Sequence, residues 1–413
     1  MAITLVAIAA LAAFGAQAQS SVSLTGNIDL GYAVTTEKGS STAVNTNEVA
    51  ADATTRKQSR PLGNGAEGWT SSQVVMTINE DIGGGVKAGY VLDMNLSSWG
   101  AGADSANQGL GTQRQSFLSL SDAKLGEVRA GYQYTLQDQI QGGVGRATPT
   151  GNVGGRIQNF SFNTDPNRAA LASGKVNREG YEVISAGNVT RANAFQYASP
   201  VFSGFQGMVQ YATVADDKTS TTANAGGKAD GKLTAVAAKY SQGPLNLGLA
   251  YQELVSDAAT YGTAATKDLK VTTKDTTFAA NYDFQVAKVF LNTFTRKSDV
   301  AAGTGMNGTI DTSAWGLFKN NGSLKRTGTD LGVSAPFGKT TVFAAYGSGK
   351  YTIDTDNTGS GDAKIKGRLL GATYDFSKRT SLNAYYAFTK ATYEGQVNEA
   401  SKKNVGFGLR HQF

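Results

Sequence analysis

The sequence has no cysteine, one histidine and six prolines among its 413 residues. Without cysteine the chain can form no disulfide, no thiolate nucleophile and no cysteine-ligated metal site. The single histidine, His411, excludes a histidine-cluster metal site and is poorly placed to act as a catalytic base. Asp and Glu total 32, but no two of them stand out as an acid–base pair. We therefore expect no enzyme activity, no metal and no cofactor.

The sequence also has no apolar run, beyond its N-terminus, that approaches the roughly 18 residues of a membrane-spanning helix. Mean hydropathy is −0.26. This average does not exclude a membrane, because strands of a transmembrane barrel alternate lipid-facing and lumen-facing residues. The 51 glycines beside six prolines favour many strands joined by turns over helices. The net charge of +6 is dispersed without a basic run, so we expect no nucleic-acid binding.

The first residues are typical of an export signal. Ile3 to Phe14 form a largely apolar segment, and Ala16-Gln17-Ala18 provides a cleavage triplet. We predict that residues 1–18 are a signal peptide and that the mature chain begins at Gln19. The usual positive charge is missing from the first four residues, so the start is misassigned or the signal is atypical. A buried apolar strand or helix is the alternative.

Strict alternation of apolar and polar residues marks both ends of the mature chain. Val22, Leu24, Ile28, Leu30 and Tyr32 share one face of the first segment, and polar residues occupy the other. The last segment alternates in the same way up to Phe413. A period of two over this length predicts a strand with one apolar and one wet face.

Between the terminal strands the same signals predict fourteen more, which makes sixteen in all. They lie near 71–80, 86–96, 113–121, 126–135, 191–199, 204–213, 232–241, 245–254, 274–283, 288–297, 324–335, 339–349, 364–376 and 379–390. The connections alternate between short and long. Long ones fall near 35–70, 97–112, 136–190, 214–231, 255–273, 298–323, 350–363 and 391–401.

Seven short turns and eight long loops are what an even-stranded barrel with both termini on one side requires. Closure also removes the exposed edges of the sheet and satisfies its backbone groups in lipid. We therefore predict an all-β fold, a sixteen-stranded antiparallel transmembrane β-barrel spanning 19–413. Trp69 and Trp99 would lie at its outer end and Phe413 at its periplasmic end, as interfacial aromatics do.

Four segments carry a family resemblance. NEDIGGGVKA at 79–88, RANAFQYASP at 191–200, YDFSKRTSL at 374–382 and the ending GLRHQF at 408–413 closely resemble the general porins of β-proteobacteria. The resemblance implies a homotrimer in the outer membrane of a Gram-negative bacterium, in contact with lipid and lipopolysaccharide. It also implies that the third loop, 136–190, folds inward to narrow the pore. The C-terminal Phe413 resembles the signal by which the barrel assembly machinery recognises such chains.

Selectivity should depend on charges that face water at the narrowest section. Alternation places five residues of each sign in the lumen: Asp29, Lys87, Asp93, Glu127, Arg129, Lys239, Asp275, Arg326, Asp330 and Arg410. The third loop carries a small positive excess that includes Arg146 and Arg156 against Asp138 and other carboxylates. Our candidate selectivity residues are Arg146, Arg156, Arg114, Lys87, Asp93, Arg129 and Asp138.

The family often lines its wall with arginines, and two positions where the resemblance implies them hold Gln73 and Tyr132 instead. Arg114 and Lys87 match the family pattern. Alternation from Arg129 turns Tyr132 toward lipid, unless a bulge at Gly131 redirects it. These departures predict only a mild anion preference, contributed mostly by Arg146 and Arg156.

Loop 350–363 comes nearest to a metal site. Asp354, Asp356 and Gly359 fall at the first, third and sixth positions of an EF-hand pattern, but Ile365 takes the twelfth, where a bidentate Glu is needed. The pattern therefore fails. Loose binding of a divalent cation, or bridging of lipopolysaccharide at the rim, is the minor alternative to a solvated loop.

We expect a water-filled channel for passive diffusion of ions and small hydrophilic solutes. Two alternatives remain open from the sequence. One is a substrate-specific anion channel, which would show a saturable current. The other is a non-conducting adhesin or structural barrel, whose lumen would be plugged.

Overall fold

The computed structural model describes residues 20–38, 55–62, 72–97, 109–145, 191–214, 229–258, 269–302, 321–355, 361–393 and 399–413. Within these ranges the chain forms seventeen strands and one helix, α2 (Leu136–Gly143). The strands are β1 (Ser21–Lys38), β2 (Thr55–Leu62), β3 (Gln73–Gly83), β4 (Val86–Ser97), β5 (Gly109–Asp122), β6 (Gly126–Tyr134), β7 (Arg191–Ala198), β8 (Phe205–Val214), β9 (Ala229–Gln242), β10 (Leu245–Ala258), β11 (Leu269–Asp283), β12 (Lys288–Ala302), β13 (Asn321–Phe337), β14 (Thr340–Thr355), β15 (Gly361–Asp375), β16 (Thr380–Tyr393) and β17 (Glu399–Gln412).

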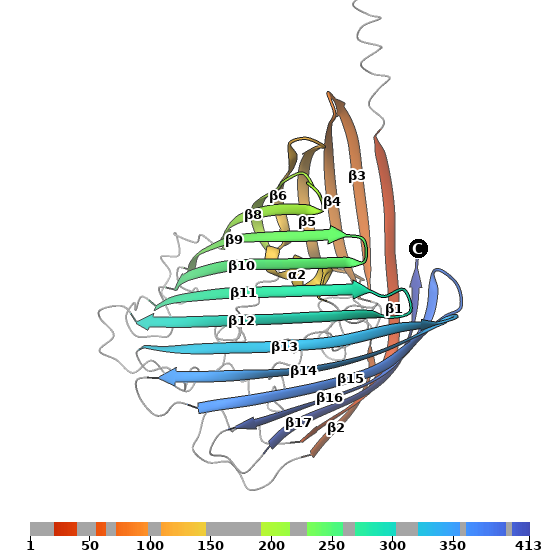
Figure 1. The fold of residues 1–413 in the computed structure, drawn as a ribbon, viewed down its shortest axis with the longest axis vertical. Helices are drawn as coiled ribbons and strands as arrows, with labels where there is room; N and C mark the ends of the chain where they lie inside the picture. Colours follow the sequence, from red (N-terminus) through yellow and green to blue (C-terminus); the bar gives the residue numbers. More distant parts are fainter. Residues whose placement is uncertain are drawn as a thin grey trace, which may run out of the picture.

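The strands form one closed antiparallel sheet (Figure 1). From β3 to β17 each strand pairs with its neighbours in sequence, and β17 pairs back with β1. Two strands share one position beside β1: β2 pairs with Gly31–Lys38 and β3 with Ser21–Asn27. With this shared position counted once, the barrel has the sixteen strand positions that alternation predicted.

The prediction of a long loop over 35–70 was wrong in part. β1 continues to Lys38, and β2 lies within the predicted loop. Three residues of β1, Ile28–Leu30, lie between the two pairings and face no partner strand there. The Ser72 hydroxyl takes the place of a partner strand at Asp29. It accepts a hydrogen bond from the Asp29 N–H (3.0 Å) and donates one to the Asp29 carbonyl (3.2 Å). The backbone groups of Asp29 therefore stay satisfied where the partner strand is interrupted.

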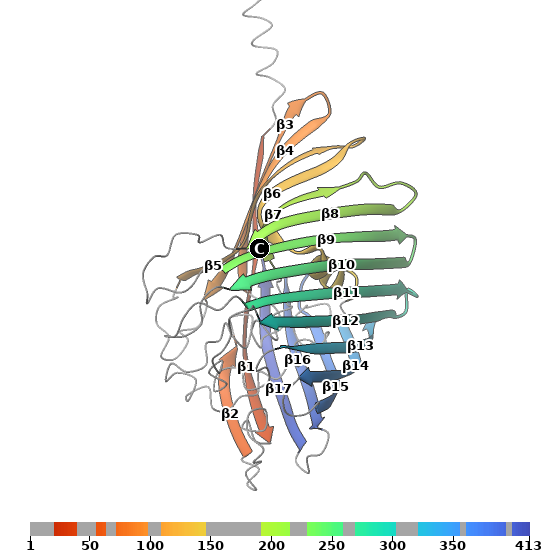
Figure 2. The same cartoon turned by 90° about the vertical axis from the view of Figure 1, so that its left-hand side faces the viewer.

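Short turns join the strands at one end of the barrel, at the seven places predicted. In three of these turns an aspartate side chain accepts a hydrogen bond from the backbone N–H two residues later. The Gly83 N–H donates to Asp81, the Lys124 N–H to Asp122 and the Gln285 N–H to Asp283. The other ends of these strands, where the described ranges stop, lie at the opposite end of the barrel, and Figure 2 shows the strands from the side. The strands extend further toward that end than predicted, for example to Leu269 in β11 and Thr355 in β14.

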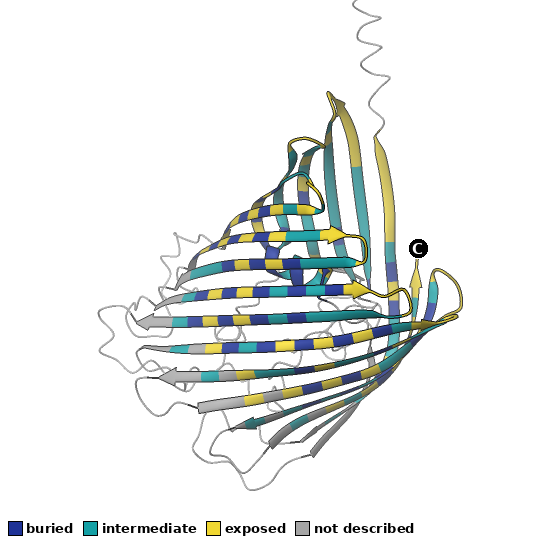
Figure 3. Ribbon diagram, in the orientation of Figure 1, coloured by how far each residue is buried: buried dark blue, intermediate teal, exposed yellow. Residues whose placement is uncertain are grey.

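Exposure alternates along the strands (Figure 3). On β7, for instance, Ala194 is 3% exposed on the inner face and the neighbouring Phe195 is 68% exposed on the outer face. Large apolar side chains are exposed in this way on strands all around the barrel. A soluble protein rarely exposes so continuous an apolar surface, whereas a lipid-facing wall requires one.

Among the described residues, no helix is long and apolar enough to cross a membrane.

Aromatic residues gather at the end with the short turns. Ring centroids lie 4.5 Å apart for Phe205 and Tyr240, and again for Tyr282 and Phe284. Such a girdle marks the level where lipid meets water. Phe413 lies at this end, as predicted, whereas Trp69 and Trp99 are outside the described residues.

Phe413, the last residue, takes part in closing the barrel by pairing with β1. The N–H and carbonyl of Phe413 form reciprocal 3.1 Å hydrogen bonds with the carbonyl and N–H of Gly26. Gly26 leaves room for the aromatic ring, since a Cβ there would lie 2.6 Å from the Phe413 Cζ.

On the inner face of β12–β17, aromatic rings lie over glycines. Phe294 faces Gly328, Phe343 faces Gly371, and each ring occupies the space that a Cβ on its directly opposite partner would need. Tyr385 covers Gly406 in the same way. Phe343 and Tyr385 also join a small buried cluster with Leu369 and its neighbours.

Candidate functional site

Helix α2 lies inside the barrel against the inner wall formed by β8 to β11, and Figure 1 shows it behind β10. Its apolar side chains, Leu136 and Ile140, are completely buried, and Val144 follows them one turn later. The facing wall is made of apolar residues, most of them alanines: Ala194, Ala198, Met208, Ala212, Leu233, Ala235, Ala237, Ala250 and Ala279. The predicted inward fold of the third loop is therefore confirmed over residues 136–145.

The wall is shaped to receive this helix. Gly248 of β10 faces α2 so closely that a Cβ there would lie 2.9 Å from Ile140 Cγ2 and 3.3 Å from Val144 Cγ2. Burial of three apolar side chains on this wall supplies the main force that holds the loop inside, roughly 1.5–3 kcal/mol for each side chain.

Wall side chains also satisfy the backbone at both ends of α2, where a helix leaves polar groups unpaired. At the first turn the Leu136 N–H donates to Gln210 Oε1 (3.2 Å), and Thr135 Oγ1 accepts from the Asp138 N–H. Beyond the last turn Asn281 Nδ2 donates to the Val144 carbonyl (2.9 Å). Gln141 Nε2 donates to Thr277 Oγ1 (2.8 Å) between them. The helix is thus fixed to β8 and to β11.

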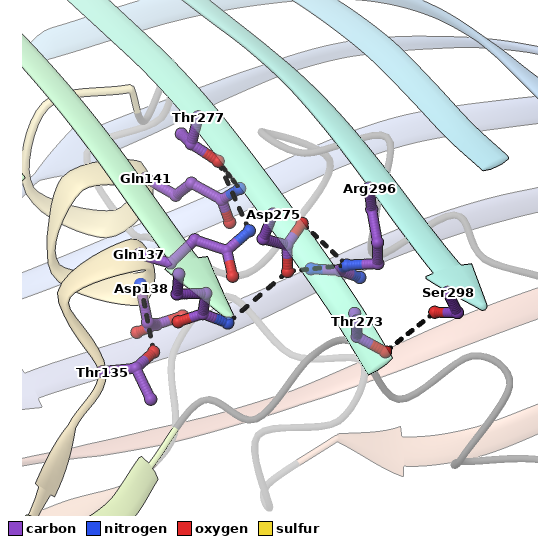
Figure 4. A network of polar contacts seen from close by, with 10 residues as sticks. Thr135, Gln137, Asp138, Gln141, Thr273, Asp275, Thr277, Arg296 and Ser298 are labelled. Atoms are coloured by element: carbon purple, nitrogen blue, oxygen red, sulfur yellow. Dashed lines mark hydrogen bonds and ion pairs between the residues drawn. The ribbon is translucent and has the colours of Figure 1, made fainter. Parts of the chain in front are cut away.

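A buried ion pair lies beside these anchors (Figure 4). Arg296 Nε contacts both carboxylate oxygens of Asp275, at 2.9 and 2.8 Å, and the two side chains are 3% and 0% exposed. Gln252 Nε2 donates to the same carboxylate at 3.4 Å. On the next strand Arg326 lies directly opposite Arg296, with its guanidinium 5.7 Å from the Phe294 ring centroid. This part of the wall therefore holds two buried arginines, Arg296 and Arg326, and two buried carboxylates, Asp275 and Asp330.

A second basic cluster lies where β5 and β6 separate above their last pairing, Ser116 with Tyr132. Arg114 Nε binds Asp93 Oδ2 (3.2 Å), and its Nη2 donates to the Tyr134 hydroxyl (2.5 Å). Arg191 Nη2 donates to the same hydroxyl at 3.2 Å, and its guanidinium lies 4.8 Å from the Tyr134 ring centroid. Arg114 and Arg191 therefore both donate to the hydroxyl of Tyr134.

A β-bulge explains how Arg114 reaches Asp93. Asp93 pairs with Gln115 and Met94 pairs with Gln113, so that Arg114 is an extra residue without a partner of its own. Such a bulge brings two successive side chains opposite one residue and redirects the first of them. Simple alternation from the outward Leu118 would have turned Arg114 to lipid.

The remaining predicted wall residues lie on the inner face. Arg129 pairs with Glu127 at 2.7 Å and places its guanidinium 5.1 Å from the Phe117 ring centroid. Lys87 is exposed near the short turn after β3, and Asp138 lies on α2, where it interacts electrostatically with Arg191. Arg146 and Arg156 lie outside the described residues.

The bulge considered at Gly131 does not occur. Pairing continues without a shift through Gly131 on both sides, and Tyr132 lies opposite Asn193 and Ser116 on the outer face. Gly131 instead has a positive φ of 133°, and a Cβ there would lie 2.8 Å from Phe117 Cα. Alternation, rather than the resemblance, gave the right side for Tyr132.

Three features of the site were missed from the sequence, and two had a signal. Leu136, Ile140 and Val144 recur at a spacing of four, and Thr135 precedes them as a helix N-cap, so that α2 could have been predicted. Arg296 falls on the inner phase of its predicted strand. The position of Arg191 beside Tyr134 had no such signal, because it depends on how β5 and β6 separate.

A family model described as Gram-negative porin matches residues 4–393. The chain belongs to the Gram-negative porin family. Outer membrane porin proteins of Bordetella pertussis and Delftia acidovorans are 27% and 29% identical to it, each over 99% of both chains. The solved structure of an anion-selective porin from Comamonas acidovorans has the same fold, with a TM-score of 0.62, 24% identity, and coverage of 96% of this chain and 100% of that one.

The resemblance drawn from the four sequence segments is thereby confirmed. This porin is an outer-membrane protein of the Gram-negative type, and its exposed apolar surface is the face that meets lipid. Among the residues that the structure describes, no group of three or more acidic residues and histidines could hold a metal ion. Asp356 and Gly359 of the failed EF-hand pattern are outside those residues.

Proposed function

We propose that this porin is a water-filled channel for passive diffusion of ions and small hydrophilic solutes, with a mild preference for anions. The observation that carries the proposal is the docking of α2 inside a closed barrel whose inner wall carries charges that include Arg114. A sixteen-stranded barrel is wide enough for an aqueous channel, so an element inside it sets the exclusion limit.

The sign of the preference follows from the wall. To the balanced set of ten charges predicted from alternation the structure adds Arg114 and Arg296 on the strands away from the short turns, whereas the acidic residues that it adds on the inner phase, Asp81 and Asp375, lie beside the short turns. Because low-dielectric walls focus the field of such charges, a small excess of cations favours anions. We keep Arg146 and Arg156 as further contributors from the third loop.

Conductance in planar bilayers tests the proposal. We expect open channels in steps of three, because the resemblance implies a homotrimer, and a reversal potential that indicates anions in a salt gradient. An ohmic current supports a general pore, a saturable one a substrate-specific channel, and silence a non-conducting barrel. Either of the last two results would overturn the proposal.

Single variants locate the preference. Arg114→Gln, Arg146→Ala and Arg156→Ala should each lower the anion-to-cation permeability ratio about fourfold, since a unit charge about 10 Å away through water contributes about 0.4 kcal/mol to the energy of each ion, with opposite signs for anion and cation. Lys339→Gln, in a short turn, should leave the ratio unchanged. A ratio that does not move in Arg114→Gln would remove this residue from the ion path.

Two processing steps belong to the same proposal. Residues 1–18, outside the described part, act as a signal peptide, and protein purified from outer membranes should then begin at Gln19. Phe413 acts as the recognition signal for the barrel assembly machinery in addition to closing the ring. Phe413→Ala should lower the amount of assembled protein in cells more than it lowers the refolding yield in detergent, and equal losses would leave Phe413 with a closing role alone.

A further inference from the structure

We propose that the inner wall of β14–β17, at the end with the short turns, binds small zwitterions of the α-amino acid class. The site is a polar pocket of about 100 Å³, hereafter the mouth pocket, whose lining includes Asp375, Lys378, Arg379, Ser381 and Arg410. One water needs roughly 10–15 Å³ of such space, so that the pocket has room for a solute of a few heavy atoms. The pocket lies on strands that α2 does not contact, and the inference therefore goes beyond the proposed diffusion channel.

The strand register places charges of both signs in one row across β15, β16 and β17. Asp375 lies directly opposite Ser381, and Ser381 lies directly opposite Arg410. The row belongs to the inner face, because Ser381 is 8% exposed whereas the next residue, Leu382, is 42% exposed on the outer face. With neighbouring strands about 4.8 Å apart, the backbones at Asp375 and Arg410 are about 10 Å apart. A carboxylate and a guanidinium therefore reach the pocket from two sides.

The guanidinium of Arg410 lacks a hydrogen-bond partner where one is needed. Its Nε is buried and has no acceptor, although Asp375 and Asp29 are near enough for their charges to act on it. Among the residues that the structure describes, no ion pair joins Arg410 to Asp375. A buried N–H without an acceptor costs free energy, and a ligand oxygen that accepts from Arg410 removes this cost.

Hydrogen bonds within the wall fix the rim of the mouth pocket. In the turn between β15 and β16, Ser377 Oγ accepts from the N–H groups of Arg379 (3.2 Å) and Thr380 (3.0 Å). The Arg379 carbonyl accepts from the Gln412 N–H (2.7 Å), which ties this turn to the end of β17. A pocket whose backbone is held in this way loses little conformational entropy when a ligand binds.

The charges around the pocket favour a ligand that carries both signs. Lys378 and Arg379 line the rim and Arg410 lines the wall, so that a simple cation is repelled. Asp375 lines the same pocket and Asp29 lies directly opposite Arg410 on β1, so that a simple anion meets two carboxylates. In an α-amino acid the carboxylate accepts from Arg410 and the ammonium donates to Asp375, and both hydrogen bonds are charge-assisted.

The affinity of such a site is low, and a low affinity suits a position at the mouth of a channel. Two charge-assisted hydrogen bonds in a pocket open to water correspond to a Kd of about 1 mM. A site in a conducting path must bind well enough to be entered and weakly enough to be left. If the barrel conducts as proposed, occupancy of the mouth pocket raises the flux of small amino acids when they are dilute.

Probes of equal size separate the two charged groups of the ligand. L-Alanine carries both groups, L-lactate keeps the carboxylate but has a hydroxyl in place of the ammonium, and L-alaninamide keeps the ammonium but has an amide in place of the carboxylate. Each probe is titrated into refolded protein in detergent, and the NMR signal of its methyl group reports binding. We expect L-alanine to bind with a Kd of about 1 mM and the other two probes to bind about tenfold more weakly.

Variants of the protein test the same two contacts. Asp375→Asn and Arg410→Gln should each weaken L-alanine binding about tenfold, because each removes one charged partner. Glu80→Gln and Lys124→Gln make the same changes of charge at exposed positions near other short turns and should bind like the native chain. Asp375 is itself exposed, so that Asp375→Asn tests the site without disturbing the buried part of the wall.

Three results would overturn the proposal. One is equal binding of L-alanine and L-lactate, which would mean a simple anion site. Another is L-alanine binding that is the same in Asp375→Asn and in Glu80→Gln. The third is no binding of L-alanine to the native chain at concentrations well above the expected Kd.

Binding in detergent separates this inference from the proposed function, because it requires no conduction. A native chain that is silent in bilayers but binds L-alanine through Asp375 would reject the channel and retain the mouth pocket. A native chain that conducts but does not bind L-alanine would reject the mouth pocket and retain the channel.

Discussion

The inner wall of β8–β11 and the inner wall of β12–β17 differ in what covers their small residues. The first is lined by alanines and a glycine, and α2 covers it with Leu136 and Ile140. The second is covered by its own aromatic rings, which lie over Gly328, Gly371 and Gly406. Small residues on the inner face therefore have two structural roles. They leave space either for another segment that packs on the wall or for an aromatic ring of the neighbouring strand.

The buried pair Asp275–Arg296 lies between the two walls, and removing half of it gives the largest expected effect. Arg296→Met leaves the Asp275 carboxylate buried without a cation and should lower the free energy of unfolding by about 3–5 kcal/mol. Denaturant unfolding of the refolded barrel measures the loss. The double variant Asp275→Asn/Arg296→Met should recover most of it, and a single variant as stable as the native chain would show that water already reaches the pair.

Loosening the docked wall should have the next largest effect. Ile140→Ala removes a completely buried side chain from the interface and should weaken docking of α2 by about 2–4 kcal/mol. The expected readout is a larger and noisier single-channel current, because the helix then leaves the wall part of the time. Gly143→Ala is the control, since this residue is exposed on the same helix and a Cβ there would meet nothing within 4 Å. Equal currents in the two variants would contradict the assignment of α2 as the constricting element.

Disturbing the self-covered wall should have the smallest effect. Gly371→Ala forces the Phe343 ring out of its recess and should lower stability by about 1–3 kcal/mol with no change in ion selectivity. Adding Phe343→Leu should restore part of the loss, because the smaller side chain leaves space for the new methyl group. Additive losses in the double variant would mean that the ring and the glycine do not interact.

The two walls also differ in how far the sequence revealed them. Alternation found all sixteen strand positions and the inner face of the ten wall charges that it predicted, because one outward apolar residue in two is a physical requirement of a lipid-facing wall. It could not tell a wet inner wall from a covered one. The runs of inward alanine in β7 and β9 were the available sign of a covered wall.

Local backbone irregularities account for most of the remaining errors. β2 has little alternation and contains Pro61, so nothing in its composition predicts a strand, and its pairing to β1 follows from the neighbouring chain. The inward turn of Arg114 depends on a bulge that no residue type announces. The site could be predicted where it obeys the period of two, and it could not where one extra residue breaks that period.

The contact between Gly26 and Phe413 has a consequence for assembly. Elsewhere in the barrel, neighbouring strands follow one another along the chain, so that their pairing costs less loop entropy, whereas this seam joins residues from opposite ends of the described chain. The barrel is therefore a series of sequential antiparallel pairs that is closed by one long-range pairing, between β1 and β17. The folding rate should depend on the β1–β17 pairing far more than on any single sequential pair, because non-local closure is the slow step of a topology built from sequential pairs.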